Sequence, residues 1–256
     1  QGALHPDTLN MAGAMANLLV NQSEFVKAEA LYRETIAGLR ERQGPDHQQT
    51  LYTMGAFGGM LATLKRYDEA EVYLRESVDL FVKKYGENNA NTLNAQSSLA
   101  NLLRMQGKMD ESVALLGQLL TKYREVSGES HMNTIVAYFN LGTALRVKGD
   151  FEEARENLSE SVSKCEKVLG KDNLQTAFIR IGLARALTEL KEFTESLAMA
   201  EESWRVISLV PGASLDRRKS AADCFIELYT AWETAQPEIG YAQKAEEWKK
   251  TKEELK

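Results

Sequence analysis

Apolar side chains recur along this chain at two spacings, one within short segments and one between segments. Within a first segment, Phe57 is followed four positions later by Leu61, with the small residue Gly58 between them. This i, i+4 spacing predicts an amphipathic helix whose backbone is approached closely by another helix. The two apolar columns return every 42 residues, as Met15, Phe57, Leu99, Leu141 and Leu183 and as Leu19, Leu61, Leu103, Leu145 and Leu187.

A second apolar segment follows the first in every unit. In the second unit it begins at Tyr67, passes the small residue Ala70 and continues through Leu74, Val78 and Phe81. The equivalent starting positions are again aromatic or methionine, namely Phe25, Met109, Phe151 and Phe193. Each unit of 42 residues is therefore predicted to be a pair of helices, here called helix A and helix B.

Glycine and threonine mark the boundaries of the units at the same period. The glycines are Gly2, Gly44, Gly86, Gly128, Gly170 and Gly212, and the threonines are Thr8, Thr50, Thr92, Thr134 and Thr176. Each glycine follows the last apolar turn of a helix B, where a left-handed residue costs least. We expect one polar column just before helix A to supply the N-caps, from Asp46, Asn88, Ser130 and Asp172.

A fixed period of this length is the signature of an α-solenoid, in which each helix pair buries its apolar face against its neighbours. We expect an all-α chain with five 42-residue repeats in residues 1–212 and a degenerate sixth repeat with a C-terminal capping helix in residues 213–256. Because Gly2 falls on the repeat register, we also expect a further repeat or another domain ahead of residue 1.

The repeat resembles the tetratricopeptide repeat, which has a small residue within helix A, an aromatic residue at the start of helix B and an alanine three residues later. Two segments, Gly44-Pro-Asp-His-Gln-Gln-Thr-Leu and Lys65-Arg-Tyr-Asp-Glu-Ala-Glu, are similar to the long repeats of kinesin light chains. The resemblance implies a right-handed superhelix of stacked antiparallel helix pairs. It also implies a non-catalytic scaffold for protein–protein interaction that binds a peptide or protein segment in a concave groove lined by helix A.

Two alternative functions remain open. The segments Leu228-Tyr-Thr-Ala-Trp232 and Ala245-Glu-Glu-Trp248 resemble the end of repeat tails behind bacterial serine/threonine kinase domains. That resemblance implies a regulatory or docking tail of a multidomain enzyme. The other alternative is a self-assembly module that stacks through its first helix.

Helix A positions that packing does not require are the candidate groove residues. Asparagine can clamp a peptide backbone with a donor and an acceptor, and arginine pairs with carboxylates. We therefore expect a peptide with apolar anchors and acidic side chains. The alternative is that the arginines are solvated charges paired with acidic residues on adjacent helices. The candidates are Asn17, Tyr52, Asn94, Asn101, Arg104, Phe139, Arg146, Phe178 and Arg185.

Composition narrows the classes of partner. The formal net charge of −6 argues against nucleic acid and anionic membranes. The chain contains no apolar run of about 18 residues that could span a membrane. We expect a cytoplasmic protein without membrane insertion, and its oligomeric state is left open.

The sequence offers no constellation for catalysis, and we expect no cofactor and no metal site. His5, His47 and His131 share one repeat column, so neighbouring repeats hold them too far apart for one zinc ion. We therefore predict a structural role for them. Cys165 lies in an apolar column of helix B and is predicted to be a core residue. The glycines around Gly55 either let helices approach or leave room for a ligand.

Overall fold

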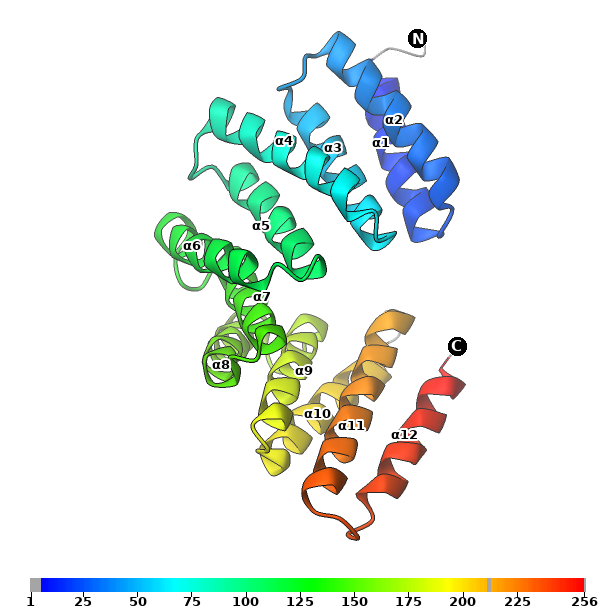
Figure 1. Cartoon of the computed structure of the whole chain (residues 1–256), viewed down its shortest axis with the longest axis vertical. Helices are drawn as coiled ribbons and strands as arrows, with labels where there is room; N and C mark the ends of the chain where they lie inside the picture. The colour runs from blue at the N-terminus through cyan, green and yellow to red at the C-terminus, as the bar shows by residue number, and fades with distance from the viewer. Residues whose placement is uncertain (1–5, 211–212, 256) are drawn as a thin grey trace. The chain divides into compact units, whose positions relative to one another are not determined.

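The structure is a computed structural model that describes residues 6–210 and 213–255, so Gly2, His5 and Gly212 lie outside the described residues. The described residues form helices, each pair joined by a short loop (Figure 1). The helices are α1 (Pro6–Asn21), α2 (Phe25–Arg42), α3 (Gln48–Thr63), α4 (Tyr67–Tyr85), α5 (Ala90–Met105), α6 (Met109–Ser127), α7 (Met132–Lys148), α8 (Phe151–Leu169), α9 (Leu174–Glu189), α10 (Phe193–Leu209), α11 (Leu215–Ala235) and α12 (Tyr241–Glu254).

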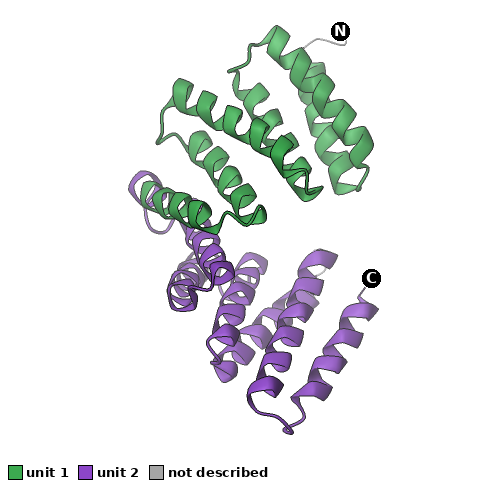
Figure 2. Ribbon diagram, in the orientation of Figure 1, with its two compact units in different colours: residues 1–122 green, residues 123–256 purple. Residues whose placement is uncertain are grey.

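Helices that follow one another in sequence also pack against one another. The pairs α1 with α2, α3 with α4, α7 with α8, α9 with α10 and α11 with α12 are in contact, and α2 also contacts α3. The chain divides into two compact units, residues 1–122 (unit 1) and residues 123–256 (unit 2), shown in Figure 2. The prediction of an all-α solenoid built from consecutive helix pairs is confirmed.

One hydrogen bond recurs at every described junction between repeats. The hydroxyl of a buried threonine near the start of helix A donates to the carbonyl oxygen of the glycine six residues before it. The Oγ1–O distances are 2.9 Å for Thr50–Gly44, 2.8 Å for Thr92–Gly86, 2.7 Å for Thr134–Gly128 and 2.9 Å for Thr176–Gly170. Gly86 has φ 84° and ψ 165°, a conformation open essentially to glycine alone. The repeating glycines and the repeating threonines therefore form one hydrogen-bonded turn between successive repeats.

The predicted N-caps were wrong by one residue. The capping column is His47, Asn89, His131 and Asn173, each of which accepts a hydrogen bond from the backbone N–H two residues later. These four residues have extended backbones, as His47 does with φ −70° and ψ 138°, and helix A begins directly after them. Each N-cap is therefore the residue that follows the predicted one, and the predicted residues Asp46, Asn88, Ser130 and Asp172 do not cap helix A. The structural role predicted for His47 and His131 is that of N-cap.

The two helices of a pair approach each other closely at the small residue within helix A. A Cβ atom added at Gly58 would lie 2.8 Å from Cγ of Leu74, and one added at Gly142 would lie 2.7 Å from Cγ of Leu158. Both leucines are buried, so neither side chain has space to move away. Cys165 is also buried, which confirms its predicted place in the core.

An ion pair links adjacent helix pairs at one position of the repeat. In unit 1, Arg66 Nη1 lies 2.5 Å from Glu29 Oε2, and Lys108 Nζ lies 3.0 Å from Glu71 Oε2. In unit 2 the equivalent pair is Arg155–Glu192, at 2.7 Å. The charges at this position are reversed in unit 2, because the first residue is now the cation and the second the anion.

The close approach at Gly58 yields a stability prediction. We expect Gly58→Ala to lower the free energy of unfolding by about 1–3 kcal/mol, because the added methyl group clashes with Leu74. Gly59→Ala is the matched control on the same helix, since a Cβ there meets nothing within 4 Å. It should raise stability by about 0.5–1 kcal/mol through helix propensity. Urea denaturation followed by circular dichroism measures both, and equal effects would contradict the packing described.

The Glu71 carboxylate yields a prediction of pH dependence. It accepts hydrogen bonds from Gln106 and Lys108, which, with Arg75, lower its pKa from 4.5 to about 2. A lowered folded-state pKa stabilises the fold above about pH 4.5, and this contribution is lost as the pH falls towards about 2. Glu71→Gln should therefore destabilise the chain by about 1–2 kcal/mol at pH 7 and hardly at all near pH 2.

The control for this prediction is Glu34→Gln, which removes one charge at an exposed position of α2. Urea denaturation at several pH values compares the two variants with the unmodified chain. A Glu71→Gln effect that is the same at pH 7 and pH 2 would show that the carboxylate is not held in its charged form by Gln106 and Lys108.

Candidate functional site

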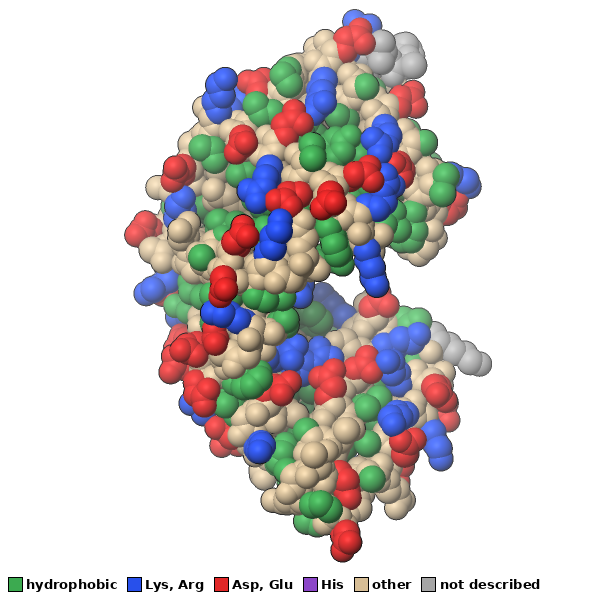
Figure 3. All heavy atoms as spheres, viewed as in Figure 1, with side chains coloured by type: hydrophobic (Ala, Val, Ile, Leu, Met, Phe, Trp, Pro, Cys, Tyr) green, Lys and Arg blue, Asp and Glu red, His purple; other side chains and the backbone are tan. Residues whose placement is uncertain are grey.

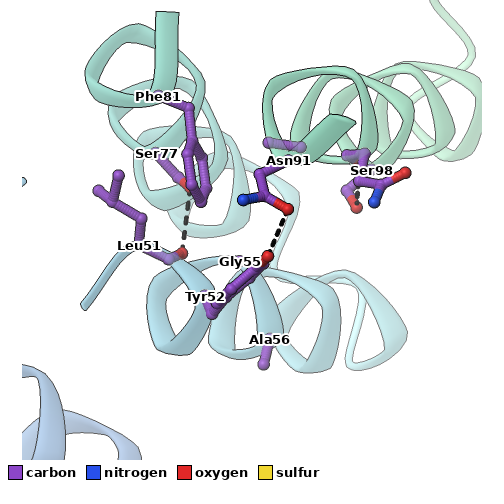
Figure 4. A pocket seen from close by; sticks show the side chains of 10 residues that line it. Leu51, Tyr52, Gly55, Ala56, Ser77, Phe81, Asn91 and Ser98 are labelled. Atoms are coloured by element: carbon purple, nitrogen blue, oxygen red, sulfur yellow. Dashed lines mark hydrogen bonds between the residues drawn. The ribbon is translucent and has the colours of Figure 1, made fainter. Parts of the chain in front are cut away.

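A hollow in unit 1 lies between helix A of two successive repeats, α3 and α5, with α4 beneath them. Its volume is about 220 Å³. Apolar and small side chains form most of its wall, and the polar residues Asn91 and Ser98 of α5 line one side of it (Figure 4). The lining residues are Leu51, Tyr52, Gly55, Ala56, Ser77, Phe81, Asn91, Asn94, Ala95 and Ser98.

Tyr52 stands at the rim of this hollow and is 41% exposed. Its hydroxyl donates a hydrogen bond to Asn91 Oδ1 on α5 at 2.5 Å, and its ring lies 5.6 Å from that of Phe81 (Figure 4). Below the rim, the buried Ser77 hydroxyl donates to the Leu51 carbonyl at 3.1 Å. The rim and the wall are thus fixed by contacts between different helices.

A second hollow, of about 140 Å³, lies on the other side of Tyr52, between α1 and α3. Tyr52 and Ala56 line both hollows. Within the second, the Tyr32 hydroxyl donates to Asn17 Oδ1. Burial raises the pKa of Tyr32, so its hydroxyl stays protonated and able to donate. Unit 1 therefore presents two neighbouring hollows that share one wall.

The glycines of α3 have separate roles. Gly58 lies against helix B, whereas a Cβ at Gly55 or Gly59 would meet nothing within 4 Å. Gly55 lines the first hollow, so its missing side chain keeps that hollow open. Gly58 therefore allows the close approach of two helices, and Gly55 leaves open space at the wall of the first hollow.

Three of the predicted site residues of unit 1, Asn17, Tyr52 and Asn94, line the two hollows. Asn101 and Arg104 lie further along α5 and line neither hollow. Arg104 Nη2 donates to Asn101 Oδ1 at 3.4 Å, a weak bond at the exposed end of the helix. Three of the five residues predicted in unit 1 therefore line a hollow, and Asn101 and Arg104 do not.

In unit 2 the predicted aromatic residues come together. The rings of Phe139 on α7 and Phe178 on α9 are 5.6 Å apart, and the guanidinium of Arg217 lies 5.5 Å from the Phe178 ring centroid. A Cβ added at Gly182 would lie 2.8 Å from Phe139 Cε2, so this ring packs directly on the α9 backbone. The result is an aromatic pair with a cation over it.

The predicted arginines of unit 2 contact carboxylates on the next helix A. Arg146 Nη1 lies 3.7 Å from Glu189 Oε1, and Arg185 Nε donates to Glu227 Oε2 at 2.9 Å. Arg185 also donates to the Ser220 carbonyl at 3.2 Å. Burial lowers the pKa of the Arg146 guanidinium, and the positive charge of Arg185 lowers it further. These pairs match the alternative in which the arginines bind acidic residues of the chain itself.

Sequence reasoning missed Asn91 and Arg217. Asn91 belongs to a column with a side-chain amide in four successive repeats, at Gln49, Asn91, Asn133 and Gln175. The amides at Asn91 and Gln175 each contact a neighbouring helix A, since Tyr52 donates to Asn91 and Arg217 donates to Gln175 Oε1 at 3.4 Å. The regular recurrence of an amide side chain in this column was the sequence feature that could have identified Asn91.

The surface charges are mixed. On the face shown in Figure 3, Lys and Arg side chains are interspersed with Asp and Glu. Within residues 6–210 and 213–255, no helix is long and apolar enough to cross a membrane. The same part of the chain holds no group of three or more His, Cys, Asp or Glu side chains arranged to bind a metal ion.

Comparison with known proteins addresses the fold. The kinesin light chain TPR-like repeats of Podosopora anserina match with a TM-score of 0.67 and 20% identity, over 79% of this chain and 96% of theirs. BtubC (BKLC) of P. vanneervenii matches with a TM-score of 0.65 and 15% identity, over 97% of this chain and 93% of BtubC. The Rap conjugation gene regulator of plasmid pLS20, solved with the Phr* peptide, matches with a TM-score of 0.64 and 14% identity. The match covers 97% of this chain and 73% of the regulator.

No curated protein matches the sequence significantly. The family model described as tetratricopeptide repeat matches residues 7–83, 58–125, 90–163 and 134–206, which together span residues 7–206. This span contains the junction threonines, both hollows and nearly all of α1 to α10, whereas α11 and α12 follow it. The chain belongs to the tetratricopeptide repeat family.

Proposed function

We propose that this chain is a non-catalytic protein-interaction scaffold that binds an extended peptide or protein segment along helix A of unit 1. The observation that carries the proposal is the pair of hollows on either side of Tyr52. Concave sites with apolar walls and a few polar groups at the edge are typical ligand sites. The Rap regulator solved with the Phr* peptide supports the proposal, because it has a similar fold.

The spacing of the hollows indicates what kind of segment fits. Packed helices lie roughly 8–10 Å apart, and an extended chain advances roughly 3.3 Å per residue. Side chains about three residues apart would therefore enter successive hollows. The amides of Asn91 and Asn94 at the edge of the first hollow are suited to contacts with the intervening peptide backbone.

We propose an acidic ligand and a second contact region in unit 2. The aromatic pair Phe139–Phe178 suits an apolar side chain, and Arg146 is the cation suited to a carboxylate. At 3.7 Å its contact with Glu189 is longer than a charge-assisted hydrogen bond, so a ligand carboxylate can form a better one. The proposed ligand is a protein segment in the cytoplasm.

A side chain that fills the first hollow should weaken peptide binding there. The probe is the tightest peptide selected from a random peptide library displayed on phage, and its affinity is measured by fluorescence anisotropy. We expect Gly55→Leu to weaken this affinity at least about tenfold, since the new side chain occupies the space of a ligand side chain. Tyr52→Ala should also weaken it by removing the rim.

Gly59→Leu is the matched control, since Gly59 is on the same helix but does not line the hollow. Circular dichroism establishes that all variants are folded. If the selected peptide binds Gly55→Leu as tightly as the unmodified chain, or if no peptide is selected, binding in this hollow is wrong.

The acidic character of the ligand has a separate test. Selected peptides should be enriched in Asp and Glu, and Arg146→Gln should lower affinity for them about tenfold because it removes a charge-assisted hydrogen bond. Arg42→Gln, at an exposed position on α2, removes the same charge as a control. Equal losses in the two variants, or peptides without acidic residues, would rule out recognition of a carboxylate by Arg146.

A further inference from the structure

The outer surface of α1 is apolar and exposed. Met11, Met15 and Leu18, which we call the α1 face, are 73%, 51% and 48% exposed. They are spaced i, i+4 and i+7 and therefore lie on one side of the helix. Asp7 is the one ionisable residue in α1, although 27% of the whole chain is charged. A surface helix ordinarily directs charged and polar residues to water, so this composition is that of a packed helix.

The repeat itself shows what this face does elsewhere in the chain. With the exception of the partly buried Ala95, all positions one or more repeats later in the same three columns are buried. They are Thr53, Phe57 and Met60, then Leu99 and Leu102, then Ala137, Leu141 and Ala144, then Ile179, Leu183 and Ala186, and finally Ala221, Phe225 and Leu228. In every later repeat this face is thus a packing surface.

In unit 1 the element that covers this face is the preceding helix pair. The ring of Phe57, which corresponds to Met15, lies 5.4 Å from the ring of Tyr32 on α2. Thr53, which corresponds to Met11, lies against α1, since a Cβ at Gly13 would be 3.6 Å from its Oγ1. An occupant of the α1 face therefore needs a helix B with an aromatic or aliphatic residue at the place that Tyr32 holds.

The last helix pair of a second copy does not meet this requirement. On α12, Trp248 is stacked on Phe225 at 3.8 Å and Tyr241 on Trp232 at 4.3 Å, so these aromatic residues are already engaged within the chain. The exposed positions of α12 that the structure describes include the charged residues Lys244, Glu246, Glu247, Lys249 and Lys250. This charged surface does not complement the apolar α1 face.

We propose that the α1 face binds a further helix pair of the same repeat type, with an apolar residue of its helix B packed on Met15. The contact continues the interface that recurs at the later junctions. This contact is independent of peptide binding in the two hollows, because Met11, Met15 and Leu18 line neither of them.

The test supplies such a helix pair. A second copy of residues 44–85 is placed directly before Gly2, so that the added pair keeps the 42-residue register and presents Leu74 in place of Tyr32. Met15→Glu is then made both in the original chain and in the extended chain. Val26→Glu is the matched control, because Val26 is 86% exposed and its repeat equivalents Asp68, Asp110, Glu152 and Thr194 are polar and exposed.

We expect Met15→Glu to have little effect on the urea midpoint of the original chain and to lower that of the extended chain by roughly 1 M. Val26→Glu should change neither. Hydrogen exchange of the α1 amides should slow at least about tenfold in the extended chain. A Met15→Glu effect of the same size in both chains, with unchanged exchange, would overturn the proposal.

Sedimentation of the original chain tests the other occupant. We expect a monomer over the micromolar range, with or without Met15→Glu. A dimer that Met15→Glu dissociates and Val26→Glu does not would assign the α1 face to a second copy of the chain, and the proposed helix pair would be wrong.

Discussion

The hydrogen bond from a junction threonine to the glycine six residues before it is the constraint on which the array depends. It fixes how far helix A begins from the end of the preceding helix B, as with Thr92 and Gly86. Gly86 allows it because its backbone adopts φ 84° and ψ 165°, which brings the chain round in a short turn. Because this geometry repeats, equivalent positions such as Phe57, Leu99, Leu141 and Leu183 are buried in successive repeats.

Most of the fold was predictable because its two periods are explicit in the sequence. The i, i+4 spacing of Phe57 and Leu61 indicates a helix, and the return of the columns indicates stacking. The N-caps were not predictable to the residue, because two adjacent columns can both cap a helix. The choice of Asn89 over Asn88 depends on a backbone dihedral angle that the composition of the columns does not specify.

The candidate site was predictable in part. Tyr52 and Asn94 were expected from their place on helix A, and both line the first hollow. The contribution of Asn91 depends on how far the Tyr52 side chain reaches between helices, a distance that no repeat pattern contains. The pairing of Arg185 with Glu227 likewise depends on the separation of α9 and α11.

The reversed ion pair has a consequence for how such an array can change in evolution. Glu29 faces Arg66 in unit 1, whereas Arg155 faces Glu192 in unit 2. Joining the helix pair that contains Arg155 to the one that contains Arg66 would bring two cations together, and joining Glu29 to Glu192 would bring two anions together. Repeats of identical length are therefore not interchangeable, and unequal recombination between them would meet electrostatic repulsion at the new junction. The polarity of the ion pairs between adjacent helix pairs therefore restricts the order in which these repeats can follow one another.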